Sequence, residues 1–154
     1  MMRSSRLLLV LLVAALAVTT SACSRRNRDA PLLEESTPEA IFNRAEYELS
    51  QNNLDDAARY FGEVERLHPY SEFAKRALVM QAFAYHADRD YENSRASAQR
   101  YIDFYPADED AAYAQYLLAL SYYDLIDDIG RDQGLTFEAL QSLRSVIELY
   151  PDSE

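Results

Sequence analysis

The chain has 154 residues and a formal net charge of −11, a length that suits one domain and a charge that disfavours binding to nucleic acid. One cysteine and two histidines exclude a disulfide framework within the chain and a cysteine-based zinc site. Only three glycines and five prolines argue against a β-sandwich or β-barrel, which needs many turns. These counts favour a helical binding module over an enzyme.

The first 22 residues have the pattern of a secretory signal peptide. Arg3 and Arg6 precede the apolar run 7–18, and small residues then lead to Cys23. The run spans only about 18 Å as a helix, which is too short for the roughly 30 Å hydrocarbon core of a bilayer. Cys23 after small residues resembles the lipobox of bacterial lipoproteins, which implies that Cys23 is lipidated, and Ser24 resembles the sorting signal for the outer membrane. The alternative is an ordinary secreted protein with an unmodified cysteine.

Residues 23–36 show no apolar periodicity and are predicted to form a flexible tether that starts at the lipidated Cys23. Three arginines near the anchor would meet lipid phosphates or simply be solvated. The remainder, from Asp29, has 10 basic against 26 acidic residues, so an anionic surface would repel it. Membrane binding is therefore assigned to the lipid anchor.

The remaining chain repeats itself three times. Segments that end alike close at Pro69, Pro106 and Pro151, which are 37 and 45 residues apart. Small residues recur in two registers upstream of these prolines: Ala45, Ala82 and Ala119 in the first, and Ala57, Ser94 and Ala139 in the second. Small residues let two helices approach closely, and proline cannot continue a helix. Periods of this length are typical of helix–turn–helix repeats, so residues 37–154 are predicted to form an all-α, right-handed superhelix (α-solenoid) of three helix pairs.

Capping residues indicate where these helices begin. Thr37, Asn53, Ser71, Asp90 and Thr136 each precede an acidic or apolar helical pattern, as N-caps do. The predicted helices are 38–51, 54–67, 71–87, 91–104, 109–126 and 137–149. The third pair is longer, and its extra residues are predicted to form a loop at 124–136. The acids of that loop lack the spacing of a calcium site, so we expect it to be solvated or to contact a partner.

The pattern resembles the tetratricopeptide repeat, and one family more closely. Its series is Pro69-Tyr70-Ser71-Glu72-Phe73-Ala74, Ala84-Tyr85, Arg100-Tyr101-Ile102 and Tyr113-Ala114-Gln115-Tyr116-Leu117. Together with the signal peptide and lipobox, this series resembles the BamD family, lipoprotein subunits of the machinery that assembles β-barrels in the outer membrane. The acidic turn at 107–110 and Ala119 depart from the family pattern, which has a His-Pro-type turn and often glycine there.

This resemblance implies a non-catalytic subunit, lipid-anchored at the periplasmic face of the outer membrane. The implied partners are a barrel-forming assembly protein with POTRA domains, other assembly lipoproteins and peptides of unfolded outer-membrane proteins. Family members carry about five repeats, so we expect a C-terminally truncated chain whose missing repeats dock the POTRA protein. The alternative is another envelope tetratricopeptide adaptor, for example one that coordinates peptidoglycan synthesis.

The first helix of each predicted pair is expected to line a concave face. Equivalent positions there form an apolar and aromatic row with one basic side chain: Phe42, Arg76, Val79, Phe83, Tyr113, Tyr116 and Tyr123. Such a row suits an extended peptide with aromatic residues, and Arg76 would pair with its terminal carboxylate. By resemblance, the peptide is the aromatic C-terminal signal of an unfolded outer-membrane protein. For each side chain, packing between helices is the alternative.

No motif in the sequence indicates catalysis. His68 stands where later repeats have Tyr105 and Tyr150, and His86 has no nucleophile at a suggestive spacing. The three glycines make no phosphate loop. We therefore predict no enzymatic activity, no cofactor and no metal site.

Overall fold

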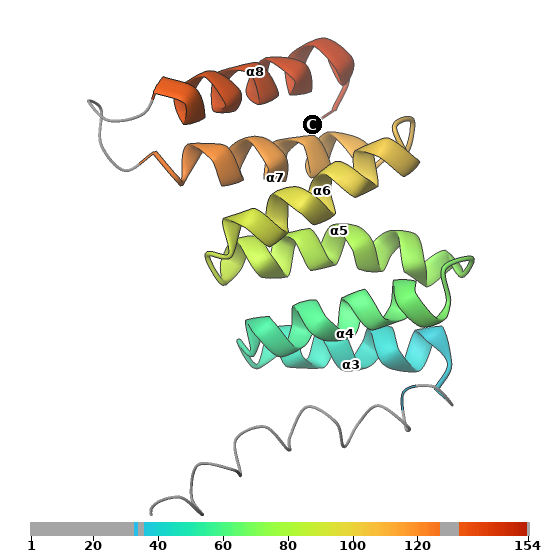
Figure 1. Cartoon of the computed structure of the whole chain (residues 1–154). Coiled ribbons are helices and arrows are strands. Elements are labelled where there is room, and N and C mark those ends of the chain that lie inside the picture. The colour runs from blue at the N-terminus through green and yellow to red at the C-terminus, as the bar shows by residue number, and fades with distance from the viewer. Residues whose placement is uncertain (1–32, 34–35, 127–132, 154) are drawn as a thin grey trace, which may run out of the picture. The chain divides into compact units, whose positions relative to one another are not determined.

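The computed structural model describes residues 33, 36–126 and 133–153, and the helical part from Thr37 onward forms a compact unit of its own. Its described residues form three helix pairs and no strand: α3 (Pro38–Ser50) with α4 (Leu54–Leu67), α5 (Glu72–Ala87) with α6 (Tyr91–Phe104), and α7 (Ala111–Tyr123) with α8 (Gln133–Leu149). Consecutive helices stack in chain order (Figure 1). The prediction of an all-α fold built from helix pairs is confirmed.

Three of the predicted N-caps make the expected hydrogen bond. The side chains of Thr37, Ser71 and Asp90 accept from the backbone N–H three residues later, at 3.2, 3.1 and 3.2 Å. Asn53 makes no cap bond to its own helix. Its Nδ2 instead donates to Glu48 Oε2 at 2.7 Å, which satisfies a buried carboxylate at the end of α3.

The third pair differs from its prediction at the ends. Helix α7 covers Ala111–Tyr123, a shorter segment than the predicted 109–126, whereas α8 begins at Gln133, four residues before the predicted start. The predicted loop 124–136 is therefore wrong over residues 133–136, and Thr136 lies inside the helix. Glycine and threonine are tolerated in a first turn, where backbone N–H groups have no partner within the helix. Loop residues 127–132 lie outside the described part of the chain.

Both registers of small residues are buried, as predicted. A chain of polar contacts crosses the second and third pairs at one of these positions. The Ser94 hydroxyl donates to the Ala82 carbonyl at 3.0 Å. The Ser121 hydroxyl lies 2.9 Å from the Ser94 hydroxyl and 2.8 Å from the Leu117 carbonyl. Helices α5, α6 and α7 are thus joined by buried hydroxyls that all have partners.

The turns inside the first two pairs have the same backbone conformation. Asn52 and Arg89, 37 residues apart, have φ angles of 59° and 62°. In each turn the next N–H donates to the carbonyl five residues back, Asn53 to Glu48 and Asp90 to Tyr85, both at 2.9 Å. This is the Schellman ending of a helix, in which a left-handed residue reverses the chain.

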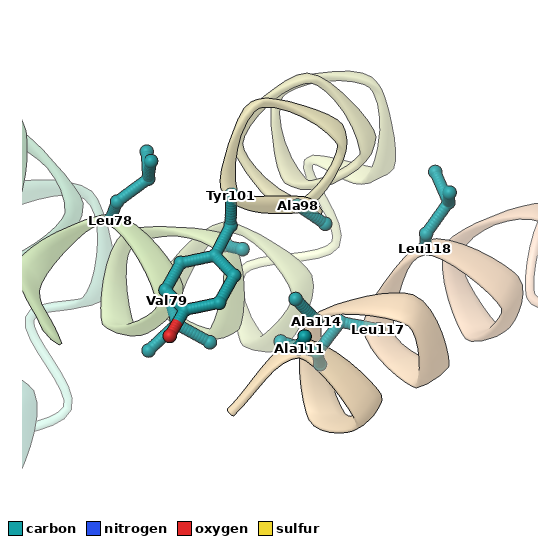
Figure 2. Close-up of a cluster of buried hydrophobic side chains, with 9 residues drawn as sticks. Leu78, Val79, Ala98, Tyr101, Ala111, Ala114, Leu117 and Leu118 are labelled. Carbon is teal, nitrogen blue, oxygen red and sulfur yellow. The ribbon is translucent and has the colours of Figure 1, made fainter. Parts of the chain in front are cut away.

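A buried apolar cluster lies between α5, α6 and α7. Its buried members are Leu78, Val79, Ala82, Ala98, Tyr101, Ala111, Ala114, Leu117 and Leu118. Figure 2 shows Tyr101 reaching from α6 towards Val79 of α5, with the small residues of α7 beside it. The alanines let the helices approach closely enough for one tyrosine ring to fill the space between them.

A buried amide joins the first pair to the second. Gln81 of α5 donates from Nε2 to the Ala58 carbonyl of α4 at 3.1 Å, and its Oε1 accepts from the Ser97 hydroxyl of α6 at 3.2 Å. Gly62 of α4 lies beneath this amide, and a Cβ atom there would stand 2.4 Å from Gln81 Nε2. The glycine therefore leaves room for the Gln81 amide between α4 and α5.

The first helices of the pairs also form a layer of their own. Besides contacting its neighbours in the chain, α5 contacts both α3 and α7. In the part of the chain that the structure describes, no helix is both long and apolar enough to cross a bilayer.

Candidate peptide-binding face

Three tyrosines of α7 are exposed on one side of that helix. Tyr113, Tyr116 and Tyr123 are 40%, 43% and 58% exposed. Their spacings of three and seven residues place them within an arc of about 80° at 100° per residue. The buried side of α7 faces the apolar cluster, so the helix holds its tyrosines on the surface.

The hydroxyl of Tyr113 is affected by burial and by a neighbouring tyrosine. Burial raises the pKa of the Tyr113 hydroxyl, and the neighbouring Tyr116 raises it further. The hydroxyl of Tyr113 therefore stays protonated at neutral pH and is a neutral hydrogen-bond donor. Tyrosines of this kind offer apolar contact area and a polar tip at low entropic cost.

Arg76 of α5 stands at the position equivalent to Tyr113, and it is exposed as well. Its guanidinium lies 4.8 Å from the centroid of the Phe42 ring. None of the ion pairs found among the described residues involves Arg76. The guanidinium of Arg76 therefore lies over an aromatic ring and pairs with no carboxylate of the described residues.

A cleft of about 640 Å³ opens beside Arg76, between the start of α5 and the start of α7. Tyr70 and Tyr105 contribute aromatic rings to its walls, and Glu72 and Lys75 contribute charges. Tyr70 is fully exposed. The cleft thus offers aromatic surface next to a guanidinium, a combination that can receive an aromatic residue with a carboxylate.

Asp108, in the turn between α6 and α7, binds Lys75, one of the side chains that line this cleft. Its Oδ2 accepts from Lys75 Nζ at 2.5 Å, and its Oδ1 accepts from the Tyr101 hydroxyl and from the Asp110 N–H. The hydrogen bonds from Lys75 and then Tyr101 lower the pKa of Asp108. The bond to Asp108 raises the pKa of Lys75, and burial together with Asp108 raises that of Tyr101. Asp108 therefore joins three helices and neutralises Lys75.

Two of the residues predicted for the groove are not on the surface. Phe42 is 1% exposed, with its ring centroid 5.3 Å from that of Phe61 and 5.4 Å from that of Phe73. Val79 is 5% exposed and belongs to the cluster between α5 and α7. The expectation that they line an open groove is wrong for both, and the packing alternative holds.

The reason lies in the layer of first helices. Phe42, Val79 and Tyr116 are equivalent positions, and the first two are covered by the first helix of the following pair. Tyr116 has no such helix after it among the described residues. Phe83 is partly buried against the cluster. Among the predicted residues, Arg76, Tyr113, Tyr116 and Tyr123 thus remain on the surface, and we call these four the binding face.

The contacts of Asp108 were missed by sequence reasoning. The acidic turn at 107–110 was visible as a departure from the family pattern, and Lys75 is the only lysine in the chain. Neither fact shows that the two side chains meet, because 33 residues separate them. Cys23, the predicted lipidation site, lies outside the described residues.

Comparison with known protein families agrees with the resemblance found in the sequence. The sequence profile of YfiO, a family described as "Outer membrane lipoprotein", matches residues 34–154. The chain belongs to the YfiO family. The predicted resemblance is therefore confirmed, since the curated relatives of this YfiO-family chain carry the name BamD.

Three of these relatives give the extent of the similarity, and each is named outer membrane protein assembly factor BamD. The one from Caulobacter vibrioides is 36% identical over 139 residues, which cover 90% of this chain and 46% of the relative. The one from Rickettsia prowazekii is 32% identical over 155 residues, 99% of this chain and 59% of the relative. The one from Neisseria gonorrhoeae is 25% identical, over 94% and 59%. The YfiO-family chain thus spans about half the length of the curated relatives it matches.

Proposed function

We propose that the chain is a non-catalytic, lipid-anchored subunit of the machinery that inserts β-barrel proteins into the outer membrane. Membership in a family of outer membrane lipoproteins supports the location, and relatives named as outer membrane protein assembly factors support the role. A barrel-forming protein with POTRA domains and other assembly lipoproteins are its proposed partners. No contact or relative described above favours the peptidoglycan-coordinating alternative.

Within this role, the binding face receives the aromatic C-terminal segment of an unfolded barrel protein. The observation that carries the proposal is the exposed Tyr113 of α7 at the position equivalent to Arg76, which forms no ion pair among the described residues. The tyrosines would pack against the aromatic side chains of an extended peptide, and Arg76 would hold the terminal carboxylate through two parallel hydrogen bonds. Tyr113 and Arg76 matter most, because their shared position is exposed in every pair, as Glu39 also shows.

Peptide titration tests this proposal. A barrel-derived peptide that ends in a free aromatic residue should bind the full chain more tightly than the same peptide without that residue or with an amidated end. Tyr113→Ala should weaken binding by about 1–2 kcal/mol, and Arg76→Lys should weaken only the free-carboxylate peptide. Tyr47→Ala is a matched control, since Tyr47 is a 55% exposed tyrosine of α3 that lies off the binding face. Equal affinities for the three peptides, or equal losses in Tyr113→Ala and Tyr47→Ala, would contradict the proposal.

The anchor is tested separately. Mass spectrometry of the mature protein should find a lipidated Cys23 at its N-terminus, and Cys23→Ser should remove both the lipid and the fractionation with the outer membrane, because the chain has no other thiol. An unmodified thiol in the wild-type mature protein would refute the lipoprotein assignment.

A further inference from the structure

Asp108 divides its contacts between its two carboxylate oxygens. Oδ1 accepts from the Tyr101 hydroxyl and from the Asp110 N–H, so this oxygen fixes the turn that leads into α7. Among the described residues, Oδ2 accepts from Lys75 Nζ of α5, at 2.5 Å, and from no other group. One oxygen therefore stabilises the turn, and the other forms an ion pair with the ammonium group of Lys75.

That lysine stands next to Arg76, and both line the same cleft. Their situations differ: Lys75 is neutralised by Asp108, whereas Arg76 lies over an aromatic ring and has no carboxylate partner among the described ion pairs. Glu72, Glu109 and Asp110 also line the cleft. An anion that enters thus meets one available guanidinium surrounded by carboxylates.

We propose that Asp108 is a specificity-determining residue of this cleft. By holding Lys75, it leaves Arg76 as the available cation, so the cleft accepts a group with a single negative charge, such as a terminal carboxylate, and discriminates against groups with more. A planar carboxylate matches the fork of one guanidinium. A second negative charge on the ligand finds no cation and is repelled by the acidic side chains of the walls. The inference rests on the proposed function for the identity of the ligand as a peptide end.

Asp108→Asn tests this with little disturbance of the fold. The amide oxygen can still accept from Tyr101 and Asp110, but the amide nitrogen cannot hold an ammonium group, so Lys75 becomes available. A peptide with an additional acidic residue next to its terminal carboxylate should then bind at least about threefold tighter than it binds the wild type, the change expected from one added charge about 7 Å away in water. The amidated, neutral peptide should bind equally to both proteins. The double variant Asp108→Asn, Lys75→Met should lose the gain.

A merely structural role for Asp108 would change the affinity of all peptides alike, and that result would overturn the inference. So would a gain that persists in the double variant. Lys75→Gln is a second test, because it keeps Asp108 and leaves the carboxylate charge of Asp108 without its cation. It should weaken binding of the free-carboxylate peptide more than binding of the amidated one, and equal effects would count against the inference.

A probe that needs no peptide separates this inference from the proposed function. Inorganic phosphate, followed by chemical shifts of the full chain at low salt, should bind near Arg76 at least about threefold tighter in Asp108→Asn than in the wild type, and not in the double variant. Equal phosphate affinities would overturn the inference whatever the peptides do. If the wild type binds no peptide but phosphate behaves as expected, the proposed function fails and the role of Asp108 in setting the charge of the cleft stands.

Discussion

The close approach at Gly62 permits a sharp test of how the first two helix pairs are joined. In Gly62→Ala, the new Cβ would stand 2.4 Å from Gln81 Nε2, so the buried amide must move and lose its bond to the Ala58 carbonyl. Loss of a buried hydrogen bond costs about 1–3 kcal/mol, whereas replacing a glycine inside a helix by alanine contributes about 1 kcal/mol. We therefore expect Gly62→Ala to lower the free energy of unfolding by about 1 kcal/mol.

The sign should reverse when the amide is absent. In a Gln81→Ala background, the space above Gly62 is open, and Gly62→Ala should raise the free energy of unfolding by about 1 kcal/mol through helix propensity alone. The coupling between the two substitutions is then about 2 kcal/mol, well above the error of a double-mutant cycle.

Urea denaturation followed by circular dichroism provides the four free energies of this cycle. Ala96→Gly, at an exposed position of α6, is the matched control and should cost about 1 kcal/mol in both backgrounds. If Gly62→Ala is stabilising to the same extent with and without Gln81, the amide does not block the position, and the reasoning about this contact is refuted.

Three further predictions follow from contacts described above. Arg89→Gly should raise the free energy of unfolding by about 1 kcal/mol in urea denaturation, because Arg89 has a φ of 62° and glycine adopts this conformation without strain. Asn52→Gly should raise it by less, since asparagine tolerates a left-handed conformation better than arginine does. Phe42→Ala should lower the free energy of unfolding by about 3–5 kcal/mol without a specific effect on peptide binding. Tyr113→Ala should change the free energy of unfolding by no more than about 0.5 kcal/mol but should weaken peptide binding. The opposite pattern would return Phe42 to the binding face. The pKa of Asp108 is lower in the folded than in the unfolded protein, so its contribution to stability is present above the ordinary value of about 3.9 and is lost as the pH falls through the lower folded value. Urea midpoints between pH 5 and pH 2 should therefore fall more steeply in the wild type than in Asp108→Asn, and parallel profiles would contradict this.

Local signals in the sequence were sufficient to predict that the chain forms helix pairs. Proline, the N-cap residues Thr37 and Ser71, and the small residues at a fixed offset each act within one or two turns, so their effects are visible without knowledge of the fold. The turn residues were less visible. Asn52 and Arg89 adopt left-handed conformations that glycine usually takes, and Arg89 has no propensity for it.

Exposure was the property that sequence equivalence failed to predict. Phe42, Val79 and Tyr116 share one position in the repeat, but the side chain at that position is buried wherever another first helix follows. Repeat register specifies which helix face a residue occupies, whereas burial depends on what packs against that face. For the same reason, the meeting of Lys75 with Asp108 depends on the packing of α5 against the turn before α7, which neither local sequence encodes.

The buried polar contacts between helices have a mechanical consequence. Pulling the first and second pairs apart must break the hydrogen bond from Gln81 to the Ala58 carbonyl. Separating the second pair from the third must break the contact between the hydroxyls of Ser94 and Ser121. Buried hydrogen bonds thus resist separation at both junctions. A longer polar contact, 3.5 Å from Gln115 Nε2 to the Ser142 carbonyl, joins α7 to α8. Load along the stack is thus carried at each junction by a buried polar contact, and the serine contacts hold α5 and α7, the two helices that carry the binding face, in register.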